Sequence, residues 1–278
     1  MNSNPLSQYF RQPAVYVQLP SEGKFYPETA LQRSENNEYA VLPMTTMDEI
    51  TYRTPDALFN GSAVVSVIQS CIPDIKNAWD MPSVDIDKVL VAIRIATYGH
   101  ELDIETKCPS CENEDSFEVD LRSILDQINS ADFSKPLTTG DLEIYFKPMS
   151  YKQINDNGMV QYEEQRMLQM LQDESIDEQQ KMTRMSEVLK KMSVVTTEAL
   201  ASNIAMVKTP QAQVTDSKHI AEWLGNCDRK MFSTIRDHIV SFKSASEIQP
   251  LTIECTNCSH KYEQSITLNM TTFFEDAS

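Results

Sequence analysis

Glycine is scarce in this sequence: the 278 residues include only six glycines, and none of them stands close to another. A P-loop or a dinucleotide-binding fingerprint needs several glycines within a few residues, because the backbone must approach a phosphate closely there. The sequence therefore excludes both kinds of nucleotide-binding loop.

Positive charge is also in short supply. The chain has 24 Lys and Arg residues against 41 Asp and Glu residues, which gives a net charge of -17. A chain of this charge is repelled at long range by nucleic acid phosphates and by anionic lipid surfaces. We therefore expect no nucleic acid and no membrane among its partners.

Long apolar runs are missing too. Residues 1–18 hold polar residues and prolines where a secretory signal would have an apolar stretch, and no later segment approaches the length of a membrane span. We expect a protein made and kept in a cytosol, where reducing conditions favour metal ligation by cysteines over disulfides. Cys71 and Cys227 stand alone among apolar or helix-forming residues, and we expect both to be small buried hydrophobes.

Recognisable catalytic patterns are absent from the sequence. It contains no GxSxG, HExxH or SxxK motif, and His100, His219 and His238 occur singly. We therefore expect a protein that is not an enzyme. The hydrophobic content of 41% is nevertheless enough for a buried core.

The first hundred residues show strand-like and then helical patterns. Residues 14–52 read as extended, with apolar alternation around a Pro-Ser-Glu-Gly turn. Thr54 and Pro55 predict the start of a helix that runs to Pro73. A second helix is predicted from about Asp85 to Tyr98, where Gly99 would end it.

Two CxxC turns dominate the remaining sequence. Cys108 and Cys111 lie between two alternating apolar patterns, and Cys255 and Cys258 lie in a second copy of this arrangement. Each copy predicts a β-hairpin with a CxxC at its tip. We expect the two hairpins to meet in space as the knuckles of a zinc ribbon and to share one composite site.

The expected cofactor is a single structural zinc ion. Four thiolates complete a tetrahedral shell and leave no position for an activated water, which disfavours a zinc hydrolase. Two alternatives remain at this point: two redox-active pairs, or four reduced thiols without metal. The redox pairs are disfavoured because neither CxxC opens a helix after a strand. His260 could replace a cysteine as a zinc ligand, but with four thiolates available it is better explained as a surface residue of the hairpin.

The stretch from Ser150 to Lys243 is rich in Gln, Glu, Lys and Met. This composition predicts an almost wholly helical insertion. Pro210 separates a long helix from a last helix at 217–242. An apolar seam recurs along it at spacings of three and four. We interpret this seam as the core of a helical hairpin, although an adaptable docking face is the alternative. The seam consists of Met182, Met185, Leu189 and Met192.

The expected fold class is α+β: an amino-terminal β segment and helices, a zinc-ribbon-like pair of CxxC hairpins, and a long mainly helical insertion between them. Phe25 and Tyr26 follow a turn and precede Pro27. They could anchor a partner or cover the core of the amino-terminal sheet. The expected domain division is 1–53, 54–100, 101–149 with the first knuckle and a linker, 150–245, and 246–278 with the second knuckle and a tail.

Several short motifs together resemble the T-even-type bacteriophage baseplate protein family. They are LPSEGKFYP at 19–27, LPMTT at 42–46 followed by Asp48 and Glu49, TPDALFNG at 54–61, and IRIATYG at 93–99 followed by the first CxxC. The resemblance covers most of the first 125 residues in order.

The family resemblance implies a non-enzymatic protein of a contractile-tailed phage, either a baseplate hub subunit or a hub assembly protein. It implies that other hub or tail proteins are the partners and that the protein is found in the host cytoplasm during tail and virion assembly. A hub subunit would stay in the virion baseplate, whereas an assembly protein would leave it. The alternative from a different class is a zinc-ribbon factor of a transcription apparatus. Clustered Lys and Arg at the knuckles would favour that alternative, but Glu112, Glu114, Asp115 and Glu118 surround the first CxxC.

Overall fold

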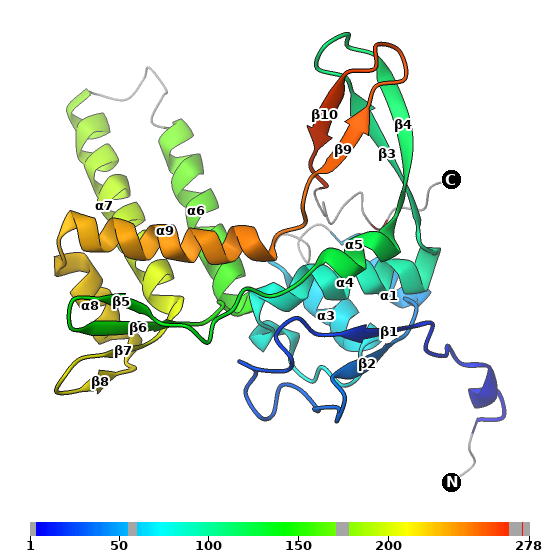
Figure 1. Cartoon of the computed structure of the whole chain (residues 1–278), viewed down its shortest axis with the longest axis horizontal. Helices are drawn as coiled ribbons and strands as arrows, with labels where there is room; N and C mark the ends of the chain where they lie inside the picture. The colour runs from blue at the N-terminus through cyan, green and yellow to red at the C-terminus, as the bar shows by residue number, and fades with distance from the viewer. Residues whose placement is uncertain (1–3, 55–59, 171–177, 267–273, 275–278) are drawn as a thin grey trace. The chain divides into compact units, whose positions relative to one another are not determined.

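The computed structural model describes residues 4–54, 60–170, 178–266 and 274. Helices and small sheets alternate along the chain (Figure 1), so the expected α+β class is confirmed. The chain forms two compact units. Unit 1 comprises residues 1–130 and 246–278, and unit 2 comprises residues 131–245.

Unit 1 begins with a short 3-10 helix η1 (Ser7–Tyr9) and an antiparallel pair of strands, β1 (Val15–Gln18) and β2 (Glu38–Val41). Val17, Tyr39 and Val41 are buried, so the pair turns alternate side chains into the core of the unit.

A helix interrupts the stretch that the sequence analysis took as extended. Helix α1 spans Thr46–Tyr52, so the extended assignment is wrong from Thr46 onward. The side chain of Thr45 accepts a hydrogen bond from the backbone N–H of Asp48, and the Asp48 carboxylate accepts one from the Thr45 N–H. This reciprocal capping satisfies backbone donors that a helix start leaves open.

Two further helices each turn a row of buried apolar side chains into the core of unit 1. Helix α3 (Ser62–Cys71) begins after Gly61, and helix α4 (Ser83–Tyr98) follows a short 3-10 turn η2 (Ala78–Asp80). The prediction of α4 and of its end at Gly99 is confirmed. The start predicted at Thr54 and Pro55 for the preceding helix is not confirmed. Pro55 lies outside the described residues, and the hydroxyl of Thr54 donates to the Ile50 carbonyl. A short helix α5 (Leu121–Gln127) follows the first CxxC hairpin.

The turn at 19–27 is held by a buried carboxylate on α4. Asp85 is completely buried and accepts hydrogen bonds from the Ser21 N–H at 2.7 Å, the Ser21 hydroxyl at 2.6 Å and the Tyr26 hydroxyl at 2.9 Å. Tyr26 is thus a core residue, 5% exposed, whereas Phe25 is 42% exposed.

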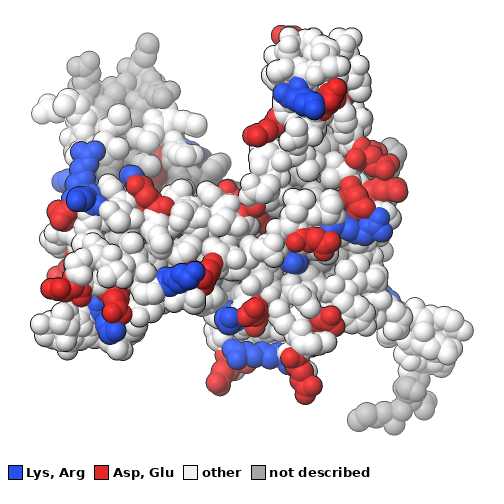
Figure 2. Space-filling view, viewed as in Figure 1, with Lys and Arg blue, Asp and Glu red and all other residues white. Residues whose placement is uncertain are grey.

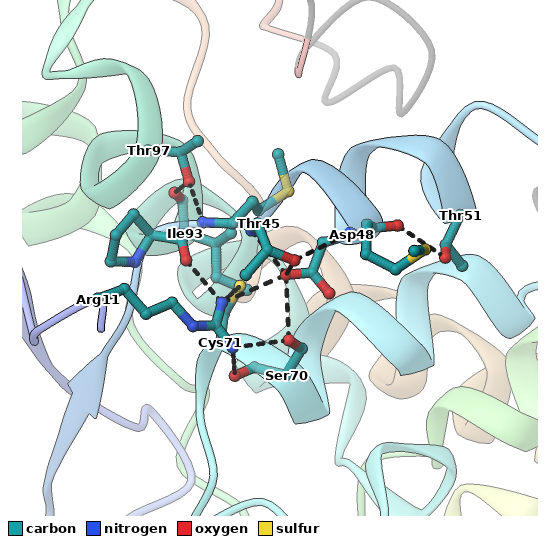
Figure 3. A network of polar contacts seen from close by, with 11 residues as sticks. Arg11, Thr45, Asp48, Thr51, Ser70, Cys71, Ile93 and Thr97 are labelled. Atoms are coloured by element: carbon teal, nitrogen blue, oxygen red, sulfur yellow. Dashed lines mark hydrogen bonds and ion pairs between the residues drawn. The ribbon is translucent and has the colours of Figure 1, made fainter. Parts of the chain in front are cut away.

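Arg11 ties the amino-terminal segment to α1 and α3 (Figure 3). Its guanidinium donates to the carbonyls of Pro43 and Ser70 at 2.7 Å each, and to Asp48 at 3.2 Å. Cys71 at the end of α3 is buried, as expected, and burial raises the pKa of its thiol to about 12. The polar network therefore fixes three separate segments against one another.

Unit 2 is built on a four-stranded antiparallel sheet of order β5-β6-β7-β8. The expected almost wholly helical character of 150–243 is wrong, because two strands of this sheet flank Pro210. The two strands pair with each other, and the first of them also pairs with a strand near residue 144, with Ile144 opposite Val207. The strands are β5 (Leu137–Thr139), β6 (Leu142–Phe146), β7 (Ile204–Lys208) and β8 (Gln213–Val214).

Four helices complete unit 2, and they are α6 (Tyr151–Met170), α7 (Glu178–Ser202), α8 (Ser217–Asn226) and α9 (Arg229–Ser246). The single last helix predicted at 217–242 is two helices. The break lies at Cys227 and Asp228, where the Asp228 carboxylate accepts the N–H of Met231 and caps α9. His219 and His238 therefore lie on different helices. Cys227 is half-buried.

Three of the four residues of the α7 seam lie outside the core of the α6–α7 hairpin, whereas the fourth, Met192, is half-buried and lines a pocket together with Val160 and Glu164 of α6. Met182, Met185 and Leu189 are 75%, 48% and 57% exposed, whereas Val188 is 2% exposed. The interpretation as hairpin core is therefore wrong for these three residues. Helix α7 turns a neighbouring face toward α6, so these three residues lie beside the interface between the two helices.

We predict that Asp85 makes stability depend on pH in an unusual direction. Desolvation by burial raises the pKa of Asp85 to about 6, against hydrogen bonds from Ser21 and Tyr26 that lower it. Between about pH 4 and pH 6 the folded protein therefore holds a proton that the unfolded chain has released, and this contribution to the free energy of unfolding falls as pH rises. In urea titrations, Asp85→Asn should abolish that fall. The exposed Asp103→Asn is the control, and equal pH dependence in Asp85→Asn and the wild type would contradict the prediction.

Candidate metal centre

The first CxxC lies at the tip of an antiparallel hairpin of β3 (Glu101–Lys107) and β4 (Glu114–Asp120). Lys107 and Glu114 form the last pair before the turn. Within the turn, the N–H of Cys108 donates to the Asn113 carbonyl and the N–H of Glu112 donates to the Cys108 carbonyl, both at 2.9 Å. Glu112 has a positive φ of 57°, which lets the chain reverse.

The second CxxC repeats this turn. It joins β9 (Leu251–Glu254) to β10 (Lys261–Gln264). The N–H of Cys255 donates to the His260 carbonyl and that of Ser259 donates to the Cys255 carbonyl, again at 2.9 Å, and Ser259 has a φ of 56°. The same backbone geometry therefore presents both cysteine pairs.

The four sulfur atoms meet in one cluster. The Sγ atoms of Cys108, Cys111, Cys255 and Cys258 all lie within 4.8 Å of one another. Cys108 Sγ lies 3.8 Å from Cys258 Sγ, and Cys111 Sγ lies 3.6 Å from Cys255 Sγ. Tetrahedral bonds of about 2.3 Å to one ion separate thiolates by about 3.8 Å, whereas a disulfide needs about 2.05 Å. The cluster therefore has the dimensions of a four-thiolate metal site.

Hydrogen bonding within the cluster favours thiolate at Cys111, whereas the contacts with the neighbouring sulfurs raise the pKa of Cys258 to about 12. A backbone hydrogen bond at Asn113, together with contacts to Cys258 and the Asn257 amide, lowers the pKa of Cys111 to about 6. Thiolate is the form that ligates metals. The group of possible ligands found among the described residues contains the four cysteines and does not include His260, whose ring stacks on Tyr262.

Further polar contacts join the hairpins beside the sulfur cluster. The hydroxyls of Thr106 and Tyr262 share a hydrogen bond of 2.7 Å. The Thr256 hydroxyl donates to the Asp115 carboxylate at 2.8 Å. These contacts orient the two turns, but they are few, so a shared ion would supply most of the connection between the hairpins.

The exposed face of the first hairpin is strongly acidic. Glu101 lies directly opposite Asp120, and Asp103 lies opposite Glu118, and like charges in such positions repel. On the face drawn in Figure 2, acidic side chains are scattered with small groups of Lys and Arg between them. This hairpin therefore offers no basic surface for nucleic acid phosphates.

The fold and the sulfur cluster define an α+β protein with a candidate four-cysteine centre between two hairpins. None of the helices in the described ranges is long and apolar enough to cross a bilayer. The chain belongs to the T4 bacteriophage base plate protein family, which matches it over residues 14–275. No curated protein and no solved structure matches the chain. The family resemblance is thus confirmed, and the protein is a structural component of a phage baseplate.

We predict that the purified protein carries about one zinc ion per chain and that Cys108→Ser loses it. Removing one of four thiolates opens the site, and metal binding is coupled to folding, so the melting temperature should fall as well. Cys71→Ser is the control, because Cys71 lies outside the sulfur cluster and this variant should keep its zinc. Elemental analysis and thermal melting measure both effects. Metal-free protein from a preparation without chelator would contradict the prediction.

We also predict that unit 1 binds zinc without unit 2. A shortened chain should join Ser130 to Ser246 through a flexible linker, because a cut after Phe146 would leave β5 and β6 without their partner β7. This chain should retain one zinc, as measured by elemental analysis. If it loses zinc while its thiols stay reduced, unit 2 is needed to hold the knuckles together and the prediction fails.

Proposed function

We propose that this protein is a non-enzymatic component of the baseplate hub that acts by binding other hub or tail proteins. The single observation that carries the proposal is the family match over nearly the whole chain. The motifs behind it are also structural anchors: the 19–27 turn is held by Asp85, and the 42–49 segment is held by Arg11.

We further propose that one zinc ion at Cys108, Cys111, Cys255 and Cys258 stabilises the protein as a zinc ribbon. The sulfur separations and the repeated turn geometry support this ligand set. Four thiolates close the coordination shell, so the ion has no open position for substrate or water. Its role is to hold residues 251–264 against residues 101–120.

Phe25 is the proposed partner contact within the 19–27 turn. Tyr26 hydrogen-bonds to Asp85 inside the unit, and it orients the turn that carries Phe25. Large aromatic side chains on a fixed backbone are frequent anchors of protein interfaces. Because Tyr26 is buried, replacing it would disturb the fold, so only Phe25 is replaced to test the partner contact.

We predict that Phe25→Ala weakens co-purification with the phage's hub proteins at least about fivefold, without lowering the melting temperature of the free protein. The control is Tyr16→Ala, which removes an aromatic side chain that is 65% exposed on β1. Equal co-purification of Phe25→Ala and the wild type would remove Phe25 from the interface. A large loss of stability would assign Phe25 to the core.

The assembly route has its own test. We propose that the protein joins the baseplate in the host cytoplasm and stays in the finished particle. Mass spectrometry of purified particles and of infected-cell lysate should detect the chain in both. Its presence in the lysate alone would replace the structural role with that of a transient assembly factor.

A further inference from the structure

A small pocket lies between helices α6 and α7 of unit 2, which run side by side (Figure 1). It has a volume of about 250 Å³ and is partly open to solvent. This volume is below the range of about 300–1,000 Å³ that is typical of pockets for drug-sized ligands. The pocket therefore suits a single long side chain better than a cofactor.

A buried carboxylate lines the pocket. Glu164 of α6 is 1% exposed. Its Oε1 atom forms an ion pair with Lys191 of α7, whose side chain is 57% exposed. Its Oε2 atom is buried and has no hydrogen-bond donor among the described residues. Because a buried charged oxygen without donors is costly, Oε2 is the atom at which a donor that enters the pocket gains most.

The other polar groups of the lining add acceptors for the same donor. The Thr196 hydroxyl donates to the Met192 carbonyl, so its oxygen can still accept a hydrogen bond. The exposed side chains of Gln161 and Gln165 bring amide oxygens to the lining. The apolar part of the lining consists of Val160, Met192 and Val195. The lining therefore matches a ligand with an apolar stem and a positively charged head that carries several N–H donors.

We propose that this pocket binds the side chain of a lysine from another baseplate protein. The lysine ammonium donates to Glu164 Oε2 and to the Thr196 hydroxyl, while its methylene stem packs against Met192 and Val195. The inference rests on the proposed function as a protein-binding component, and it names the chemistry of the partner at one contact.

The free acceptors favour an ammonium over a guanidinium or a metal ion. A guanidinium pairs best with both oxygens of a carboxylate, and Lys191 already occupies Oε1 of Glu164. A calcium ion takes about six to eight oxygen ligands, and the described lining holds one carboxylate. An ammonium is a compact charge whose donors rotate freely, so one free carboxylate oxygen is enough to hold it.

Methyl NMR of the full-length protein with 13C-labelled methionine tests the proposal. Met192 lines the pocket, so its methyl signal reports an occupant, and Met192→Leu assigns that signal. The probe is Nα-acetyl-lysine methylamide, and the matched compound carries a methyl group in place of the ammonium. We expect the lysine compound to shift the Met192 signal saturably and to bind at least about tenfold more tightly than the matched compound.

Variants locate the binding at the carboxylate. Glu164→Gln should weaken binding of the lysine compound at least about tenfold. The control is Glu163→Gln, which changes an exposed neighbour on α6 and should bind like the wild type. Both variants have the same net charge, so the general attraction of a cation to a chain of net charge -17 is matched between them.

A third variant keeps the test decisive if Glu164→Gln fails to fold, which its melting temperature would show. Lys191→Met frees the second carboxylate oxygen of Glu164, so it should bind the lysine compound at least about threefold more tightly than the wild type. Unchanged or weaker binding by folded Lys191→Met would contradict the proposal.

Three further results would overturn the proposal. The first is no saturable shift of the Met192 signal, or equal binding of the two compounds. The second is an equal loss of binding in Glu164→Gln and Glu163→Gln, which would assign the shift to general attraction. The third is Glu164-dependent binding of 1,4-diaminobutane that is tighter than that of the lysine compound, which would assign the pocket to free diamines. Zinc content and presence in particles are measured independently, so failure here is distinguishable from failure of the proposed function.

Discussion

The approach of four sulfur atoms is the constraint on which the rest of the arrangement depends. The sulfur pairs at 3.6 and 3.8 Å join residues 144 and 150 positions apart in the chain. Bringing such distant residues together costs chain entropy, which a bound ion offsets because its binding is coupled to folding. Since unit 2 is inserted between the two cysteine pairs, its chain must leave unit 1 and return to it.

Buried polar groups hold the segments of unit 1 together in a second way, which does not involve the sulfur cluster. Asp85 fixes the 19–27 turn and Arg11 fixes the 42–49 segment. The N–H of Met44 donates to the Thr97 hydroxyl at 3.0 Å, and the Tyr98 hydroxyl donates to Glu49 at 3.0 Å. Two of the motifs that carry the family resemblance, at 42–49 and 93–99, therefore contact each other in the folded unit. Each tie satisfies a group that would be costly to bury alone.

The elements that the sequence predicts well are those with strong local signals. Helix α4 has a long apolar period and ends at Gly99, and each CxxC hairpin is marked by two residues at fixed spacing. Helix α1 was missed although Thr45 and Asp48 carry its capping signal, because seven residues show little periodicity. Strand β7 was missed because Val207 pairs with the distant Ile144, and no local pattern reports such a partner.

The methionine seam shows a different limit of sequence reasoning. Periodicity shows that Met182, Met185 and Leu189 share a face, but it does not show what covers that face. The position of α6 was needed to show that Val188 is buried and that these three side chains are exposed. The same limit applied to Phe25 and Tyr26. Tyr26 is buried because its hydroxyl donates to Asp85, and the sequence does not reveal this contact because Asp85 lies on another element.

X-ray absorption spectroscopy at the zinc edge of the purified full-length protein tests the central claim most directly. The account predicts four sulfur ligands at about 2.3 Å and no oxygen or nitrogen ligand. A first shell with fewer than four sulfur atoms, completed by imidazole nitrogen or by water oxygen, would contradict the closed four-cysteine centre.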